Sequence, residues 1–254
     1  MSDYSSKELL IFDLDGTLAP SKSFLEKETA ILIANILNTK KVAVISGGNF
    51  DQFNKQFLSQ LELSSEQLHN LYLLPVTGTQ MYSWNNDQWI KKYHEENFTD
   101  SEREKILSAL PQAVSASGVA FPETTYGEQI EDRGKQITFS ALGQDAPIDA
   151  KSAWDPTHEK RQHIISVLKT FIPEFPINMG GMTSIDIGWD KGQALEKFSK
   201  EMNVSKEKIL FFGDALFPGG NDYPAQEIGL ESILVKDPAD TRTYLKNMLC
   251  AKIT

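Results

Sequence analysis

Two carboxylates stand two residues apart in the segment Asp13-Leu-Asp15-Gly-Thr17, directly after the apolar run 9–12. Residues i and i+2 of a regular strand point to the same side, so these carboxylates would repel each other unless a cation or a shared proton separated them. A carboxylate can attack phosphorus, and a second one can protonate the leaving oxygen and then activate water. An Asp-Gly turn is the alternative for Asp15 taken alone. The hydroxyl of Thr17 and the partners below favour a catalytic site.

Two further segments carry groups that could hold a phosphate. Ser46-Gly47-Gly48 follows the apolar run 42–45 and precedes an expected helix, so its glycines would let the backbone approach an anion. Lys191 stands at the start of another expected helix, where a cation opposes the helix dipole. An ordinary turn for Ser46-Gly47 and a solvated surface lysine for Lys191 are the alternatives when each is taken alone.

Acidic residues also follow the apolar run 209–212. Asp214 comes shortly after this run, and Asn221 and Asp222 follow a loop that is too rich in glycine to be helical. Mg²⁺ is a hard ion usually held by one or two carboxylates, waters and the substrate phosphate, so Asp214 is a candidate ligand. Asn221 and Asp222 could order metal-bound waters; a turn or a helix cap is the alternative for this pair.

The elements that must position these residues follow an alternating pattern. Over residues 1–85, apolar runs typical of buried strands alternate with helical spacing, which predicts a parallel sheet with right-handed crossovers. Ligands bind outside the carboxyl ends of the strands of such a sheet, so we expect the four segments to meet there. That arrangement suits metal-assisted phosphoryl transfer. The expected core elements are strands at 9–12, 42–45, 71–76, 209–212 and 232–235, and helices at 24–37 (with a capping box from Ser23 to Glu26), 50–61, 190–202 and 240–249.

Residues 86–188 have a different pattern. They mix strand and helix signals, with strands expected at 136–142 and 183–187, which predicts an inserted α+β domain. Thr99-Asp-Ser-Glu102 predicts a capping box for a helix that ends near residue 110. Asp155-Pro-Thr predicts the N-cap of a helix that ends near residue 170. The predicted α/β core is therefore discontinuous, with residues 1–85 and 189–254 on either side of the insert.

Composition and charge exclude several classes of partner. The 254 residues carry a formal net charge of −10, so no basic field would attract nucleic acid or an anionic membrane. No apolar run approaches the ~20 residues of a membrane span, and the N-terminus does not read as a signal peptide. The single cysteine, Cys250, excludes an internal disulfide and fits a reducing compartment. We expect a cytoplasmic protein whose partner is a small phosphorylated molecule, with a homodimer left open.

Together these motifs resemble the haloacid dehalogenase superfamily of phosphotransferases, whose pattern is a DxDGT loop, a Ser or Thr after the second strand, a Lys, and a GD…ND acidic loop. The resemblance implies a Rossmann-like core with a large inserted cap. Within the class that carries this cap, the chain is most similar to the eukaryotic-type phosphomannomutases. That similarity rests on Asp15-Gly-Thr-Leu-Ala-Pro20, Ser46-Gly47, Ile130-Glu-Asp-Arg133, Gly181-Met-Thr-Ser184-Ile-Asp186, Gly188-Trp-Asp-Lys191, and Phe211-Phe-Gly-Asp214 with Pro218-Gly-Gly-Asn-Asp222.

The resemblance implies roles for these residues. Asp13 would be the nucleophile and Asp15 the acid/base, while Ser46 and Lys191 would bind the transferring phosphoryl group. Mg²⁺ would be held by Asp13, the backbone carbonyl of Asp15, and Asp214. In the cap, Arg133 would contact the second phosphate or the sugar, and Ser184 and Asp186 would contact sugar hydroxyls. The expected substrate contacts are Thr17, Lys22, Gly47, Arg133, Ser184 and Asp186, and the expected metal contacts are Asp13, Asp15, Asp214, Asn221 and Asp222.

The chain departs from the mutase pattern at two positions. The mutases carry an arginine in a Gly-Arg pair after the equivalent of Arg133, where this chain has Gln144, and an arginine near the DGTLxP proline, where it has Lys22. A mutase must grip a bisphosphate in either orientation, which needs strong cap cations. We therefore expect a Mg²⁺-dependent phosphohydrolase of small phosphorylated metabolites, above all sugar phosphates, that works through an aspartyl-phosphate. A phosphomannomutase is the first alternative, and a catalytically silent sugar-phosphate binding protein is the second.

Overall fold

The computed structural model describes residues 4–250. This part of the chain divides into two compact units. The first unit contains residues 4–94, 191–217 and 222–250, and the second contains residues 95–190 together with 218–221. No helix of the described residues is long and apolar enough to cross a membrane.

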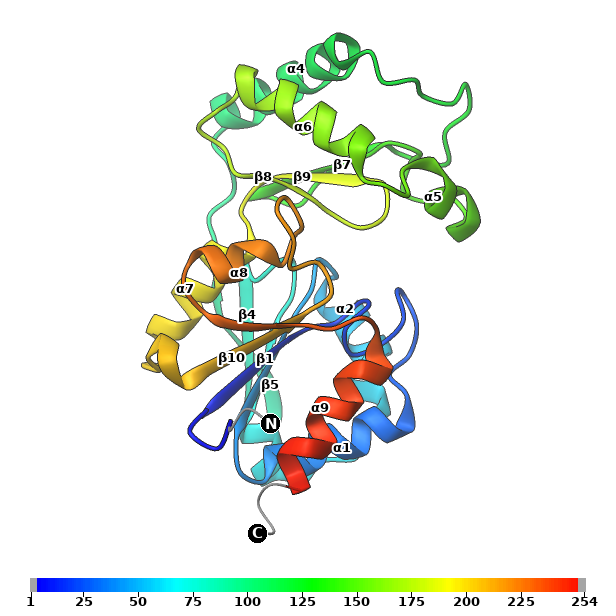
Figure 1. The fold of residues 1–254 in the computed structure, drawn as a ribbon. Helices are drawn as coiled ribbons and strands as arrows, with labels where there is room; N and C mark the ends of the chain where they lie inside the picture. The colour runs from blue at the N-terminus through cyan, green and yellow to red at the C-terminus, as the bar shows by residue number, and fades with distance from the viewer. Residues whose placement is uncertain (1–3, 251–254) are drawn as a thin grey trace. The chain divides into compact units, whose positions relative to one another are not determined.

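A seven-stranded sheet forms the centre of the first unit (Figure 1). Its strands, in spatial order, are β11 (Glu231–Leu234), β10 (Ile209–Gly213), β1 (Leu9–Asp13), β2 (Lys41–Ile45), β3 (Leu71–Leu74), β4 (Gln80–Asn85) and β5 (Gln88–His94). The strands from β11 to β3 are parallel, and β4 and β5 are antiparallel additions. Strand β1 lies between β2 and β10, so the strand order changes direction there, which is where open α/β sheets bind ligands.

Helices cover both faces of this sheet, which explains why its central strands are continuous apolar runs. Helices α1 (Lys27–Leu37) and α9 (Pro238–Cys250) pack against each other on one face, while α7 (Lys191–Glu201) and α8 (Tyr223–Glu227) lie on the other (Figure 1). Two short helices, α2 (Phe50–Gln56) and α3 (Ser65–His69), follow β2. On the α1 face, the rings of Phe12 and Phe212 from neighbouring strands stack with centroids 4.7 Å apart.

The second unit is built on a four-stranded antiparallel sheet. Its strands, in spatial order, are β6 (Ile130–Asp132), β7 (Gln136–Ser140), β9 (Ser184–Gly188) and β8 (Ile177–Met179). The long helices α4 (Asp100–Ser117) and α6 (Glu159–Phe171) pack together over one face, and α5 (Ile148–Trp154) precedes α6 (Figure 1). Apolar and polar residues alternate along β7 and β9, so one face is apolar and the other carries hydroxyls and a carboxylate.

The predicted fold class is confirmed, with a mostly parallel core sheet and a separate α+β unit. Strand β5 lies in the core sheet, so residues 88–94 group with the first unit, whereas the insert was expected to begin at residue 86. The role of the insert in substrate selection stays a prediction.

Some predicted helix boundaries are wrong. Helix α1 begins at Lys27, after an N-cap Glu26 whose side chain makes no capping hydrogen bond, and the Ser23 hydroxyl donates to the carbonyl of Ser21 instead. The helix expected over 50–61 ends at Gln56 and is followed by a short 3₁₀ turn.

In the second unit, one predicted helix start is confirmed and one is wrong. Thr99 and Glu102 form the predicted capping box of α4, although the helix continues through Pro111. Asp155 is not an N-cap, because α6 begins four residues later. Its carboxylate nevertheless accepts the backbone N–H of Lys160 at 3.0 Å, so it still satisfies a free donor of the first turn.

Candidate active site

A buried ion cluster lies at the carboxyl ends of β1 and β10. Asp13 ends β1, Lys191 begins α7, and Asp222 precedes α8, with residue exposures of 5%, 2% and 0%. Nζ of Lys191 lies 2.5 Å from Oδ1 of Asp13 and 2.6 Å from Oδ1 of Asp222. The ammonium therefore bridges a carboxylate at the end of β1 and a carboxylate from the loop between β10 and α8.

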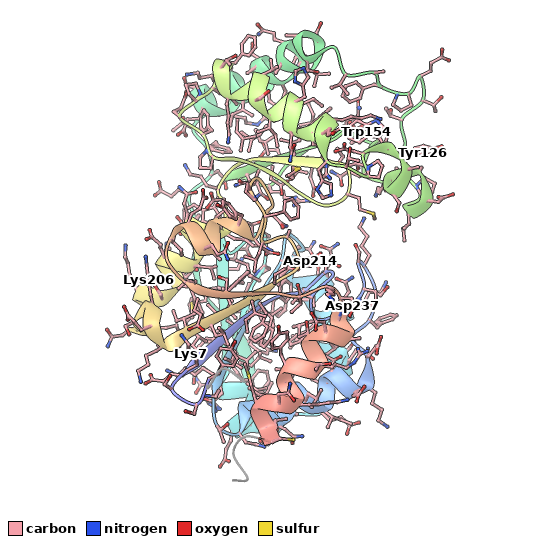
Figure 2. All side chains as sticks on the ribbon, viewed as in Figure 1. Lys7, Tyr126, Trp154, Lys206, Asp214 and Asp237 are labelled. Carbon is pink, nitrogen blue, oxygen red and sulfur yellow. The ribbon has the colours of Figure 1, made fainter. Side chains whose placement is uncertain are left out.

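Two glycines make room for the acidic loop, and sequence reasoning assigned neither of them a role. A Cβ on Gly213 would lie 2.5 Å from Cγ of Asp222. A Cβ on Gly16, where φ is +88°, would lie 2.4 Å from Oδ2 of Asp214. Figure 2 shows Asp214 just beyond the carboxyl end of β10. Any larger residue at either position would displace these carboxylates. Each glycine is next to an aspartate in the sequence, and that position could have indicated its role.

The donor set of this cluster fits a divalent metal ion. Carboxylate oxygens of Asp13, Asp214 and Asp222 all lie within 4.8 Å of one another. When all three are ionised, the paired Lys191 ammonium leaves an excess of two negative charges. A divalent cation would balance that excess, and carboxylate oxygens are the ligands that Mg²⁺ takes.

The electrostatics of the cluster support this conclusion. Burial raises the pKa of Asp13 well above its ordinary value, and Lys191 opposes the shift. Partial desolvation, followed by the charge of Asp222, raises the pKa of Asp214 to about 6. Burial acts to lower the pKa of Lys191, but Asp13 and Asp222 outweigh burial and raise it. Lys191 therefore stays protonated, whereas Asp13 and Asp214 lose their protons less readily than ordinary aspartates, and a bound cation would favour their ionised forms.

Asp15 and Ser46 form a second polar pair at the same end of the sheet. Oγ of Ser46 donates to Oδ2 of Asp15 at 3.4 Å and accepts the backbone N–H of Gly48 at 3.2 Å. Oδ1 of Asp15 accepts the backbone N–H of Lys22 at 2.6 Å. Lys22 thus acts here through its main chain, and its side chain is exposed.

Within the part of the chain that the structure describes, three other predicted site residues make no side-chain hydrogen bond that links them to these two groups. Thr17 is fully buried, and its hydroxyl has no hydrogen-bond partner among the described residues. Gly47 is half-buried beside Ser46. Asn221 groups with the second unit, whereas the adjacent Asp222 groups with the first. The first unit therefore contains the clustered carboxylates, and the metal contact expected for Asn221 stays a prediction.

The predicted cap contacts lie on the polar side of the second unit's sheet. Oδ1 of Asp186 accepts the hydroxyl of Thr138 at 2.7 Å, and the hydroxyl of Ser184 lies 3.1 Å from that of Ser140. At the β6–β7 turn, Nη2 of Arg133 donates to Oε2 of Glu131 at 2.6 Å. Three of these neighbours were not expected from the sequence. The two-residue period of β7 does place two of them, Thr138 and Ser140, on one face of the sheet. The missed residues are Glu131, Thr138 and Ser140.

The fold and the acidic cluster are those of the haloacid dehalogenase superfamily. Solved structures share this fold. An IMP-nucleotidase mutant from Plasmodium falciparum matches with a TM-score of 0.75 at 17% identity, over 97% of this chain and 68% of that chain. A trehalose-6-phosphate phosphatase from Aspergillus fumigatus matches with a TM-score of 0.55 at 14% identity, over 98% of each chain.

The chain belongs to the eukaryotic phosphomannomutase family, whose model matches residues 30–251. Phosphomannomutase 2 of Dictyostelium discoideum is 26% identical over 262 residues, which cover 96% of this chain and 97% of that protein. The resemblance inferred from the motifs is therefore confirmed at the level of the family.

Proposed function

We propose that the protein is a Mg²⁺-dependent phosphohydrolase of small phosphorylated metabolites, above all sugar phosphates. The observation that carries this proposal is the buried Asp13–Lys191–Asp222 cluster with Asp214 beside it. It combines a nucleophile, a fixed cation and a metal donor set. A protein that only bound sugar phosphates would have no need of the paired Asp13 and Asp15.

The proposed reaction has two steps. A carboxylate oxygen of Asp13 attacks the substrate phosphorus, the bond from phosphorus to the ester oxygen breaks, and protonated Asp15 gives its proton to that oxygen. Asp15 then takes a proton from water, which attacks the aspartyl-phosphate, so that inorganic phosphate leaves and Asp13 is regenerated. Ser46 and Lys191 hold the transferring group during both steps.

In this proposal, Asp13, Asp214 and the backbone carbonyl of Asp15 would hold Mg²⁺, and Asp222 would keep Lys191 in place. When bound, the metal stabilises negative charge on the phosphoryl oxygens. Arg133 would contact a second phosphate or the sugar, and Ser184 and Asp186 would contact sugar hydroxyls. The cytoplasmic location and the homodimer expected from the sequence stay predictions.

Two features of the second unit favour hydrolysis over transfer between sugar positions. Gln144 stands where we expect the mutases to have an arginine, and its Nε2 is buried without a hydrogen-bond partner among the described residues. Charge-assisted hydrogen bonds contribute ~1.5–3 kcal/mol and neutral ones ~0.5–1.5 kcal/mol, so a distal phosphate would be held less tightly by about 1 kcal/mol. Arg133 forms an ion pair with Glu131, and Glu131 would compete with a distal phosphate for the guanidinium. A bisphosphate intermediate would then dissociate sooner.

A parallel assay tests this proposal. Phosphate release is measured over sugar mono- and bisphosphates with and without Mg²⁺, beside the conversion of mannose 1-phosphate to 6-phosphate. We expect Mg²⁺-dependent release and little conversion. Gln144→Arg should shift the balance toward conversion, whereas the uncharged control Gln144→Met should not. Efficient conversion by the native protein with a bisphosphate activator would establish the mutase instead.

A further inference from the structure

Strained backbone gathers beside Asp15 and Ser46. In the described part of the chain, seven residues other than glycine have a positive φ, and four of them lie in the β4–β5 turn or at helix ends: Asn86, Asp87, His158 and Asn203. Asn, Asp and His tolerate this left-handed conformation better than most residues. The other three, Lys22, Val76 and Thr77, have φ values of 55°, 51° and 53°. All three make main-chain contacts to the candidate active site or its loop.

Val76 and Thr77 belong to the turn that follows β3. The backbone N–H of Thr77 donates to the carbonyl of Ser46 at 2.8 Å, and that of Val76 donates to the carbonyl of Gly48 at 2.8 Å. The φ and ψ angles of Val76 set the direction of the next N–H, so its left-handed conformation aims the Thr77 donor at Ser46. The N–H of Gly78 then donates to the carbonyl of Pro75 at 3.0 Å and closes the turn.

The turn also packs closely against residues of α7 and β2. A Cβ on Gly78, where φ is +72°, would lie 2.6 Å from Cβ of Ala194 and 3.3 Å from Cδ1 of Ile45. Ala194 belongs to α7, the helix that begins at Lys191. The turn is therefore packed between the Ser46 loop and the helix that carries the phosphoryl-binding lysine.

A second strained turn holds the other member of the polar pair. Left-handed Lys22 aims the N–H of Ser23 at the carbonyl of Pro20, 2.9 Å away, and in this turn the N–H of Lys22 itself reaches Oδ1 of Asp15 at 2.6 Å. Oδ2 of the same Asp15 carboxylate accepts the hydroxyl of Ser46. Both partners of the Asp15–Ser46 pair are thus held by main-chain donors from left-handed turns.

Val and Thr are poor choices for a left-handed turn that serves only the fold. Their branched Cβ crowds the following carbonyl and restricts χ1, and glycine or asparagine would form the same turn with less strain. Strained backbone persists where the surrounding structure holds it, and it clusters at functional sites. A branched residue held in this conformation is also stiffer than glycine, because glycine can adopt many other backbone conformations.

We propose that the turn of residues 75–78 is a rigid support that aligns the Ser46 hydroxyl with Asp15, and that Val76 and Thr77 are positioning residues of the active site. The inference rests on the proposed function only for the choice of assay substrate. It predicts that relieving the strain leaves the fold intact but loosens the loop of Ser46.

The test substitutes Val76→Gly, which keeps the N–H and permits the left-handed conformation. We expect a Tm equal to or above that of the native protein, because strain is lost. With p-nitrophenyl phosphate and Mg²⁺, we expect kcat to fall by about tenfold, because small misplacements of a positioning group are costly, while KM changes little. Mg²⁺-dependent binding of beryllofluoride, measured by calorimetry, should weaken in parallel. Val76→Asn is the second variant, since Asn also tolerates this conformation.

Asp87→Gly is the matched control, because Asp87 is left-handed in the β4–β5 turn, away from the ion cluster. It creates an Asn-Gly hairpin turn, so Tm should rise while kcat is unchanged. If both Val76 variants keep kcat within about twofold of the native value, or lose Tm and kcat together, the turn is merely structural and the inference is wrong. If the native protein releases no phosphate but binds beryllofluoride, the proposed function fails and the binding measurement still decides the inference.

Discussion

Oδ1 of Asp13 accepts a hydrogen bond from Lys191. In the proposed reaction, Oδ2 of Asp13 would therefore be the oxygen that attacks phosphorus. Asp13→Asn is nearly isosteric and keeps an acceptor for Lys191, but the amide cannot form an acyl-phosphate. We expect phosphate release to fall by at least about 10³-fold, as for removal of other nucleophiles. The Tm without metal should not fall, because one of three crowded carboxylates is neutralised.

Asp149→Asn is a suitable control for this variant, because Asp149 is an exposed residue of α5 and should leave both quantities unchanged. Phosphate release is followed under saturating Mg²⁺, and Tm is followed by circular dichroism. Undiminished turnover by Asp13→Asn would rule out Asp13 as the nucleophile. A large loss of Tm would mean that its charge is needed for folding.

At the scale of elements, the polar face of the β6–β7–β9–β8 sheet is the part that should select the substrate. Arg133→Ala removes a guanidinium from the β6–β7 turn, and losing a charged hydrogen bond of ~1.5–3 kcal/mol corresponds to a tenfold or greater loss in binding. We expect KM for sugar phosphates to rise by about tenfold, and KM for p-nitrophenyl phosphate to change far less.

Arg103→Ala provides the matched control at this scale. Arg103 of α4 pairs with Asp132, the neighbour of Arg133, at 2.5 Å, and its side chain is 48% exposed. Exposed ion pairs contribute little, so this variant should leave both KM values unchanged. If Arg133→Ala raised KM equally for both substrates, Arg133 would be a structural residue rather than a specificity contact.

At the scale of the whole molecule, metal binding should stabilise the first unit selectively, because the three clustered carboxylates belong to that unit. Ligand at about 100 times its Kd adds ~2.7 kcal/mol of stability, which corresponds to a Tm increase of roughly 5–10 °C for a protein of this size. We expect this shift on addition of Mg²⁺, measured by calorimetry, in the transition that reports the core sheet.

Asp214→Asn distinguishes a metal site from general ionic effects. It removes one ligand and one negative charge, so the Mg²⁺-induced shift should be lost while the fold is retained. EDTA should reverse the shift in the native protein. An equal shift in both proteins would show that Mg²⁺ acts elsewhere.

The positions of the central strands, and the polar residues that follow them, can be predicted from the amino-acid sequence. Strands β1, β2 and β10 are covered by helices on both faces, so they appear as unbroken apolar runs, and Asp13, Ser46 and Asp214 end or follow those runs. The capping box of Thr99 was readable for a similar reason, because its hydrogen bonds join residues three apart. Because these strands are parallel, their carboxyl ends lie at the same edge of the sheet, so the polar residues that follow them meet there.

Features that depend on partners far away in the sequence become visible only in the folded chain. Lys191 meets Asp13 across 178 positions of sequence, so its burial and raised pKa could not be read locally. Asp155 serves α6 without being its N-cap. Val76 adopts a backbone conformation that its own branched side chain disfavours. In each case, contacts between distant segments outweigh local preference, and local preference is all that a short stretch of sequence expresses.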